Sequence, residues 1–524
     1  MRVDPLPTPK SLPEEVGGIE KQLITRAVTF DQLVSEIRGI YAALVKAEDV
    51  CIKEVSDSDR EGVTFTDDRW KSLVKLHEVT LYEFCDFFFA TNHPVAAASD
   101  QLKNVVTKYS MPARLWRHAI YRLLDLMRRN LPGSQPHMLR FVSLAFNMIT
   151  VLYENSKDLC DVWAECLGDL ARFRMAVESE SAEERSLWIE VSRYWYQRSI
   201  DLTPGIGQRY HHIAILSRPG LLGQLLFFTK SFCTKTPFAT AKETIMTLFT
   251  QVAQGKTEGS LAVEIALVKT YSALIQDGSD GEFESSLGEF LKELERSIGP
   301  VTDENKQFSY RLAIINVHGL LNFCSPQNPL TSALVTIPSP PGTPSLPIER
   351  SLEAHNRASA RAVRLTTSCL NTILRHGAAA TSATSPYLHV LLAFLASAAQ
   401  HPNSGGLPMT QLYSQLNRDL LTGTLSVMRG RLLSTNEGYA KVVASNTLPR
   451  VELREKVSCD MKPLPEDYFI RGSVWEDLYF PATWFDNDSR DYDERVSVEG
   501  EWMDLQREIR CVWLGGRLIQ KIGW

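Results

Sequence analysis

The sequence predicts an all-α protein. Apolar residues recur three and four positions apart along most of its 524 residues, as on the buried face of an amphipathic helix. Strand signals, by contrast, are few. Between residues 163 and 238 a helix–turn–helix pattern repeats, and Pro204 and Pro237 are separated by nearly the ~34-residue period of tetratricopeptide units. These observations favour stacked helical hairpins, an architecture that usually binds other proteins rather than catalyses.

The first elements are predicted from periodicity and capping residues. Residues 30–55 repeat apolar positions at helical spacing. Thr66 can cap the next helix, two acids follow it in the first turn, and this helix should end near Pro94. Residues 112–130 and 136–155 are predicted to form the next two helices.

The later elements continue this helical pattern. In the repeat hairpins, small residues stand where two helices must approach closely, and a polar insert at 179–186 interrupts the pattern. A proline-rich stretch at 325–347 is expected to be an exposed linker or loop. The remaining predicted helices are 239–254, 260–276, 284–297, 306–323, 350–376, 387–399 and 409–433. The last 60 residues differ, because they hold five of the ten tryptophans in an acidic background.

Composition narrows the class of function. The net charge is −6, yet residues 70–140 carry ten Lys or Arg against five Asp or Glu. A dedicated nucleic-acid protein usually has a stronger basic footprint, so protein binding is favoured and a local site for an anion stays open. The longest apolar run, 387–399, is too short to span a bilayer of ~30 Å, so no membrane contact is expected. The start of the chain has no apolar run of a signal peptide.

Fragments that suggest catalysis or metal binding fail at their required spacing. Gly255-Lys256-Thr257 lacks the first glycine of a phosphate loop, and His77-Glu78 has Leu81 where a zinc protease has its second histidine. His211 and His212 point ~100° apart on a helix and are a poor metal pair. The nine cysteines contain no CxxC motif, so we expect buried free thiols. No enzyme, metal or cofactor is predicted.

Several segments resemble one family. They are LGDLARFR at 167–174, WYQRSIDLTPGIGQRYHHIAIL at 195–216, FFTKSF at 227–232, TPF at 236–238 and LPEDYFIRG at 464–472. Together they resemble the SMG adaptors of nonsense-mediated mRNA decay and the related Ever-Shorter-Telomeres telomerase subunit. The resemblance runs from about residue 30 to the C-terminus. With MPARLWRHAI and YFPATWF included, the sequence looks most like filamentous-fungal members.

The resemblance implies a 14-3-3-like helical bundle that continues into tetratricopeptide-like hairpins, with a C-terminal helical extension. The predicted parts are a disordered N-terminus at 1–29, the 14-3-3-like unit at 30–175, the hairpins at 160–325, a Pro-rich linker at 326–349 and the extension at 350–524, which ends in a Trp-rich acidic cap. We further expect a continuous right-handed helical stack without a sheet over 30–325.

The family also implies a phosphoserine site. Its early helix has a tryptophan followed five positions later by a binding lysine, which is Lys75 in RWKSLVK, and Lys71 lies one turn before it. The family's Arg-Tyr pair falls on Arg172-Phe173, where the hydroxyl is missing. We expect Lys75 and Arg172 to converge. The alternative is that the lysines form an ordinary solvated face and Arg172 pairs with Asp169 or Glu165 on its own helix.

A second basic helix can border this groove or contact nucleic acid. Its candidate residues are Arg114, Arg117 and Arg122. By resemblance, the function is a non-enzymatic adaptor in nucleus and cytoplasm that recruits a phosphorylated decay helicase or another phosphoprotein. The alternatives are a telomerase-associated subunit that binds single-stranded telomeric DNA or telomerase RNA, and a lineage-specific scaffold.

The aromatics near the C-terminus predict an anchored cap. We expect 464–472 and 479–485 to fold back onto the helices of 350–433, because large aromatics each bury roughly 150–250 Å² when packed. A helix at 499–520 should then pack an apolar face onto the same core. That predicted face is Trp502, Leu505, Ile509, Val512, Trp513 and Ile519. An exposed partner-binding patch is the alternative.

Overall fold

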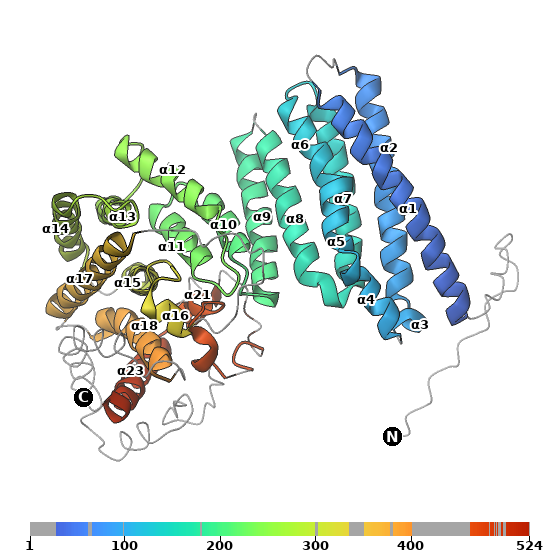
Figure 1. Cartoon of the computed structure of the whole chain (residues 1–524). Coiled ribbons are helices and arrows are strands. Elements are labelled where there is room, and N and C mark those ends of the chain that lie inside the picture. Colours follow the sequence, from blue (N-terminus) through green and yellow to red (C-terminus); the bar gives the residue numbers. More distant parts are fainter. Residues whose placement is uncertain are drawn as a thin grey trace, which may run out of the picture. The chain divides into compact units, whose positions relative to one another are not determined.

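The computed structural model describes residues 28–522 except 61–64, 98, 179–180, 299–301, 335–350, 378–380, 401–461 and several positions between 482 and 498. The predicted helix at 409–433 and nearly all of the predicted disordered N-terminus lie outside the described residues. Within them the chain is all-α, as predicted, and its only extended pairing is two isolated bridges (Figure 1). The chain divides into two compact units, Met1–Ser156 and Lys157–Trp524, which are described separately.

The first unit is built around helix α2 (Asp67–Asn92), which packs on α1 (Phe30–Ser58) and α7 (Gln135–Asn155). Thr66 caps α2 as predicted, by accepting from the Arg69 backbone N–H. The short helices α3 (Pro94–Ala97) and α4 (Asp100–Lys108) follow α2.

The helix predicted at 112–130 has a more complex form. It comprises α5 (Met111–Arg114), a π-helical segment η1 (Leu115–Tyr121) and α6 (Arg122–Arg129). The Nδ1 atom of buried His77 lies 2.8 Å from the Ala119 carbonyl oxygen. His77 therefore ties α2 to the π-helical segment.

The second unit opens with helical hairpins. After a 3-10 turn η2 (Lys157–Leu159), the chain forms α8 (Cys160–Val177), α9 (Ala182–Leu202), α10 (Gly207–Leu216) and α11 (Leu221–Phe232). Helix α8 groups with this unit and lies in the range that both the predicted 14-3-3-like unit (30–175) and the predicted hairpins (160–325) include. A Cβ on Gly168 would lie 2.9 Å from the Tyr196 ring, which explains why α8 has a small residue where α9 approaches.

The hairpins continue into a larger helical body. It contains α12 (Ala241–Ala253), α13 (Ala262–Ile275), α14 (Asp280–Ser297), α15 (Asp303–Leu320), α16 (Pro329–Leu334), α17 (Leu352–Gly377), α18 (Thr381–Gln400), α21 (Pro465–Ile470), a 3-10 turn η4 (Glu476–Leu478) and α23 (Glu501–Ile522). The short helix α16 stands inside the predicted linker, and its Leu330 and Leu334 are buried. Helix α18 is buried from Tyr387 to Ala398, which explains its apolar run. No helix of the described residues is long and apolar enough to cross a membrane.

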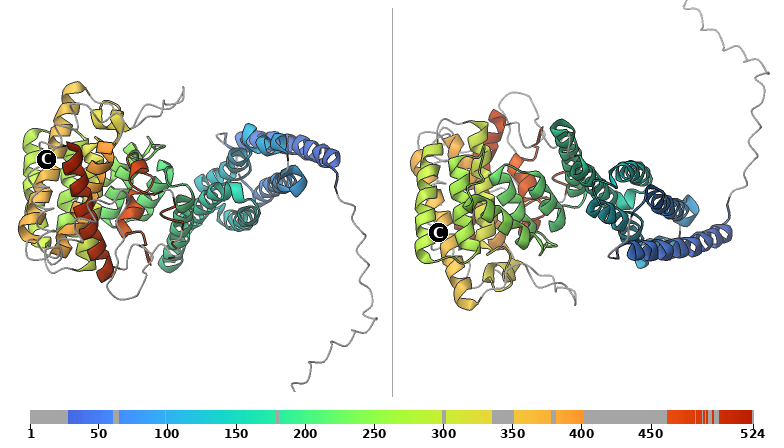
Figure 2. Two further views of the ribbon diagram at one scale, coloured as in Figure 1. Left: turned by 90° about the horizontal axis from the view of Figure 1, so that it is seen from below. Right: turned by 90° about the horizontal axis from the view of Figure 1, so that it is seen from above.

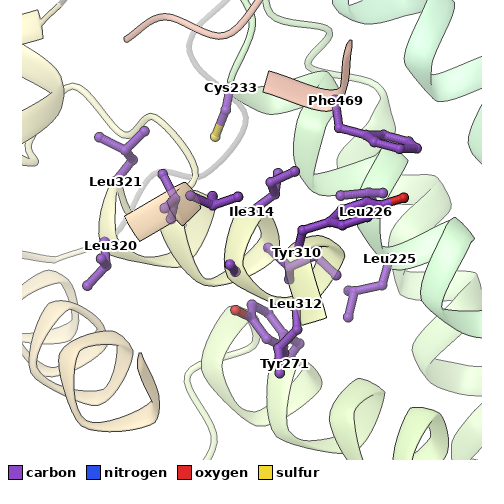
Figure 3. Packing of buried hydrophobic residues seen from close by; sticks show 14 of the residues in the cluster. Leu225, Leu226, Cys233, Tyr271, Tyr310, Leu312, Ile314, Leu320, Leu321 and Phe469 are labelled. Atoms are coloured by element: carbon purple, nitrogen blue, oxygen red, sulfur yellow. The ribbon is translucent and has the colours of Figure 1, made fainter. Parts of the chain in front are cut away.

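Helix α18 lies between α15 and α23, and Figure 2 shows α23 running alongside it. The core of the unit also includes the C-terminal segment, because Phe469 of α21 packs 5.8 Å from the Tyr310 ring and 6.0 Å from the Phe227 ring. Figure 3 shows Phe469 in this cluster with Tyr310, Leu225 and Leu226.

The segments that carry the family resemblance meet at one place in this unit. The loops after α9 and α11 pair through two bonds, from the Gly207 N–H to the Thr236 carbonyl and from the Thr236 N–H to the Gly205 carbonyl, both 2.8 Å. The C-terminal segment joins them through the Val474 N–H, which donates to the Cys233 carbonyl at 3.0 Å. Three segments are thus bonded to one another here, namely LTPGIG at 202–207, TKSFCTKTP at 229–237 and the segment that follows LPEDYFIRG at 464–472.

Buried Lys230 fixes this junction. Its Nζ donates to the Ile470 and Arg471 carbonyls at 3.0 and 2.8 Å and to the Ser473 hydroxyl at 2.6 Å. These carbonyls lie at the C-terminal end of α21, so the lysine satisfies acceptors that a helix end leaves unpaired. Gly472 has φ of +81°, and a Cβ there would lie 2.0 Å from the Pro204 carbonyl oxygen. Only glycine fits this turn without strain.

The C-terminal segment folds back as predicted, but onto more of the unit than the helices of 350–433. It contacts α10 and α11 at the junction, and η4 packs on α18. The predicted face of α23 was partly wrong. Val512 and Trp513 are buried, whereas Ile519 is exposed. Besides Val512 and Trp513, the helix buries Met503, Asp504, Gln506, Arg507, Glu508, Arg510, Cys511, Leu514 and Leu518.

Arginines can be buried on this helix because each forms hydrogen bonds with buried carboxylates. Arg507 donates to Glu466 at 2.7 and 2.8 Å and to Glu499 at 2.6 and 2.8 Å. Arg510 donates to Asp467 at 2.8 and 2.9 Å. Buried charges need such pairing, and it lets two arginines stand where an apolar face was expected.

Candidate phosphate-binding site

Lys71 and Lys75 lie one turn apart on the exposed side of α2. Trp70, immediately before them, is buried and stacks on Phe65 with ring centroids 4.2 Å apart, which anchors the first turns of the helix. The lysine side chains are 59% and 69% exposed. The sequence therefore places two ammonium groups in solvent on one face.

Among the described residues, the carboxylate partners of both lysines lie on their own helix. Lys71 forms an ion pair with Asp67 and lies 3.6 Å from Asp68, and Lys75 lies 3.4 Å from Glu78. The hydrogen bond from Lys71 to Asp67 raises the pKa of Lys71. Exposed pairs of this kind contribute little stability, so an incoming phosphate can replace them at low cost.

Arg172 lies on α8 of the second unit and is partly exposed. Its Nη2 lies 3.2 Å from Oδ1 of Asp169, so the carboxylate partner on its own helix is present as the alternative interpretation predicted. Asp169 is buried and also accepts from the Tyr196 hydroxyl at 2.5 Å. Burial raises the pKa of Asp169 to about 6, although Arg172 and Tyr196 oppose the shift. The other predicted partner, Glu165, instead accepts from buried Arg209 at 2.9 Å.

The hydroxyl that the sequence resemblance implies beside the arginine is absent at Phe173. Tyr196 does not restore it, because this residue is fully buried and its hydroxyl is bonded to Asp169. A phosphate at Arg172 would thus be held by the guanidinium without that bond.

The histidine pair of α10 is structural, as the sequence indicated. His212 Nδ1 lies 3.5 Å from Asp169, and His211 Nε2 lies 3.0 Å from the Thr244 hydroxyl. Burial lowers the pKa of His211 to about 4, and the charge of Arg172 adds to the shift. Both rings are therefore neutral at physiological pH. Among the described residues, no three His, Cys, Asp or Glu side chains are arranged to hold a metal ion.

The basic helix of the first unit gives a mixed result. Arg114 donates through Nε to Glu48 at 3.1 and 3.2 Å and through Nη1 to the Tyr41 hydroxyl at 3.2 Å. Glu48 is buried, so Arg114 holds α5 against α1. Arg117 is exposed and Arg122 half-buried, and neither forms an ion pair within the part of the chain that the structure describes.

The structure thus brings Lys71 and Lys75 together on one unit, while Arg172 belongs to the other. The predicted convergence of Lys75 and Arg172 stays a prediction. Sequence reasoning missed the Tyr196 hydroxyl and the buried pairing of Arg209. No local signal marks either one, because their carboxylate partners lie on other helices.

Comparisons with known proteins agree with the fold. No family model and no curated protein matches this chain. Among solved structures, a chain of the crystal structure of Est1 and Cdc13 matches with a TM-score of 0.50 and 8% sequence identity. The match covers 85% of this chain and 96% of that chain. At this identity the likeness shows an Est1-like helical fold and agrees loosely with the resemblance in the sequence.

Proposed function

We propose that this chain is a non-enzymatic helical adaptor that recruits partners by binding a phosphorylated segment. The observation that carries the proposal is the pair of exposed ammonium groups at Lys71 and Lys75, one turn apart on a well-anchored helix. Two cations at this spacing suit a dianionic phosphate. By the sequence resemblance, Arg172 is a further candidate phosphate ligand, since a guanidinium can hold two phosphate oxygens at once.

The sequence resemblance supports the biological setting. We propose recruitment in nonsense-mediated mRNA decay, in nucleus and cytoplasm, through a phosphorylated decay helicase or another phosphoprotein. Affinity purification of the full chain with mass spectrometry tests this setting. Decay factors would support it, whereas telomerase subunits would support the alternative.

Fluorescence anisotropy with a labelled phosphoserine peptide tests the site. Lys75→Glu should weaken binding by about 10- to 100-fold, the range for a lost charge-assisted hydrogen bond. The melting temperature should not change, because Lys75 is exposed. Lys46→Glu is the matched control, since Lys46 is an exposed lysine on α1. Equal affinity for the phosphorylated and unphosphorylated peptide would contradict the proposal.

Arg172 needs a gentler change than charge reversal. Its partner Asp169 is buried, so Arg172→Glu would also destabilise the fold. Arg172→Lys keeps a cation beside Asp169 but removes the two-pronged contact, and should weaken phosphopeptide binding several-fold. Arg185→Lys on exposed Arg185 of α9 is the control. Unchanged affinity in Arg172→Lys would remove Arg172 from the site.

The telomerase-associated alternative is favoured by one specific surface. Arg117 and Arg122 flank Tyr121, which is 43% exposed, and exposed aromatics between cations suit single-stranded nucleic acid. The fold likeness to a chain of the crystal structure of Est1 and Cdc13 is compatible with this role. Binding of single-stranded DNA or RNA that falls steeply with salt and is lost in Arg117→Glu would support it.

A further inference from the structure

The π-helical segment η1 rearranges the basic face of the first unit. The backbone N–H of Arg122 donates to the carbonyl of Arg117, five residues earlier. With this bonding the fifth residue stands about one turn above the first, whereas in an α-helix it lies ~140° around the axis. The segment therefore brings Arg117 and Arg122 to one side, although the continuous α-helix expected at 112–130 would have separated them.

Neither arginine is neutralised within the part of the chain that the structure describes, where no carboxylate forms an ion pair with Arg117 or Arg122. The acids on either side are bound to other cations. Glu48 of α1 accepts from Arg114 at 3.1 and 3.2 Å. Asp125, three residues after Arg122, pairs at 2.8 and 3.2 Å with the two arginines that end α6. Two guanidinium charges are therefore left uncompensated.

The imidazole of His118 shows that these charges act at one place. Burial lowers the pKa of His118, Glu48 opposes this shift, and the charges of Arg122, Arg117 and Arg114 lower the pKa further. Like charges one turn apart destabilise a helix, and π-helical turns are rare features that often mark functional sites. An anion held between the two guanidinium groups would offset their repulsion.

The number and placement of the charges suit one dianion. A guanidinium can hold two phosphate oxygens at once, and a phosphorylated side chain carries nearly two negative charges at neutral pH. The patch ends at neutralised Arg114 on one side and at Asp125 on the other, so it does not continue as the cationic track that a nucleic acid follows. Arg117 is exposed and Tyr121 is 43% exposed, so the patch is open, whereas free small molecules are usually held in enclosed pockets.

We propose that Arg117 and Arg122 bind the phosphate of a phosphorylated side chain on a protein partner. Charge complementarity identifies the ligand, because two cations without carboxylate partners stand together. The inference does not rest on the phosphate site at Lys71 and Lys75, since that site lies on α2 and this one on η1. The chain would then present two phosphate sites, and either one can fail without the other.

Fluorescence anisotropy with a labelled phosphoserine peptide in an alanine background tests the η1 site. The full chain carries Lys75→Glu, so that the α2 site does not contribute. Adding Arg117→Gln or Arg122→Gln should weaken binding by about 10- to 100-fold, the range for a lost charge-assisted hydrogen bond. Adding Arg140→Gln, which removes an exposed arginine on α7, is the matched control and should leave the affinity unchanged.

The outcomes separate the two sites. If the Lys75→Glu chain does not bind the phosphopeptide, or if both η1 variants bind it like the control, the η1 inference is overturned. The α2 site is judged separately, by comparing Lys75→Glu with the wild type. Neither η1 variant should lower the melting temperature, because each removes a repulsion between exposed charges. Equal binding of the unphosphorylated peptide also overturns the inference.

Two further probes identify the source of the phosphate. A labelled single-stranded oligothymidine would stack its bases on Tyr121. If it binds, and Tyr121→Ser and Arg117→Gln both abolish that binding while the phosphopeptide does not bind, the patch is a nucleic-acid site and the inference is wrong. If free phosphoserine displaces the peptide as effectively as the unlabelled peptide does, the site takes a small phosphate compound and the protein partner is ruled out.

Discussion

Arg507→Met should weaken the attachment of the C-terminal segment more than any surface change. Arg507 is fully buried and donates to both Glu466 and Glu499. Methionine fills similar space without charge. Of the two side chains that bond to Glu466, the variant keeps only His389, whose Nδ1 lies 2.9 Å away. Removing one member of a buried ion pair costs about 3–5 kcal/mol, because the other charge stays desolvated.

The pH dependence of this loss has a defined sign. Burial alone raises the pKa of the Glu466 carboxyl, but Arg507 and His389 outweigh it and hold the pKa well below its usual range. In the wild type Glu466 therefore stabilises the fold at every pH above its ordinary pKa of ~4.3. In the variant burial is no longer opposed by Arg507, so the pKa rises above the ordinary value and stability falls as pH increases. The stability difference should be largest near pH 7 and smaller near pH 4.5.

Hydrogen exchange with mass spectrometry measures the effect where it arises. A global melt would combine two units, whereas exchange in 465–478 and 501–520 reports the local free energy of opening. Arg364→Met is the control, because the Arg364–Glu284 pair of 2.7 Å is exposed and should contribute under ~1 kcal/mol. The reasoning is refuted if Arg507→Met loses no more protection than Arg364→Met, or if its deficit grows as pH falls.

Three other predictions follow from buried contacts. Gly168→Ala should cost about 1–3 kcal/mol by overpacking Tyr196, while Gly288→Ala, with open space around its Cβ, should not destabilise; chemical denaturation decides. Burial lowers the pKa of His77 to about 4, so the stability that neutral His77 contributes is present above pH ~6.5 and lost as pH falls toward 4. Over this range the free energy of unfolding of the first unit should drop by about 3 kcal/mol. A His77→Gln variant should show a flatter dependence of stability on pH. Truncation after residue 458 should give insoluble or protease-labile protein, and a stable monomer that only loses a partner would favour the exposed-patch alternative.

Helical periodicity and capping predicted the fold well because both signals are local. The start of α2 at Thr66 and its end near Pro94 follow from residues within one turn of each end. The π-helical segment within Met111–Arg129 could not be predicted, since its contact with His77 spans 42 residues of sequence. The apolar pattern alone also misplaced the face of α23, because Arg507 counts as a surface residue until Glu466, 41 residues away, is placed beside it.

The difference between local signals and contacts far apart in sequence also applies to the candidate site. The pairing of Arg172 with Asp169 was among the sequence alternatives because three residues on a helix are neighbours. The pairing of Arg114 with Glu48 was not, because 66 residues separate them. Periodicity also could not reveal that the apolar positions Val79, Tyr82 and Phe89 of α2 face solvent, since a helix packed on several sides gives no simple polar stripe.

The junction formed by Lys230 and Ser473 has a consequence for biosynthesis. The loops after α9 and α11 are made long before residues 470–474 that complete them, and at ~5–20 residues per second this gap lasts roughly 12–50 s. Throughout it, buried Lys230 has no carbonyls to bind. The apolar faces of α11, and of α15 and α18 once they are made, lack part of their cover. In the described part of the first unit, side-chain hydrogen bonds join residues up to 73 positions apart, against 240 for the bond from Lys230 to Ile470. We therefore expect the nascent second unit, rather than the first, to be the one that holdase chaperones retain during translation.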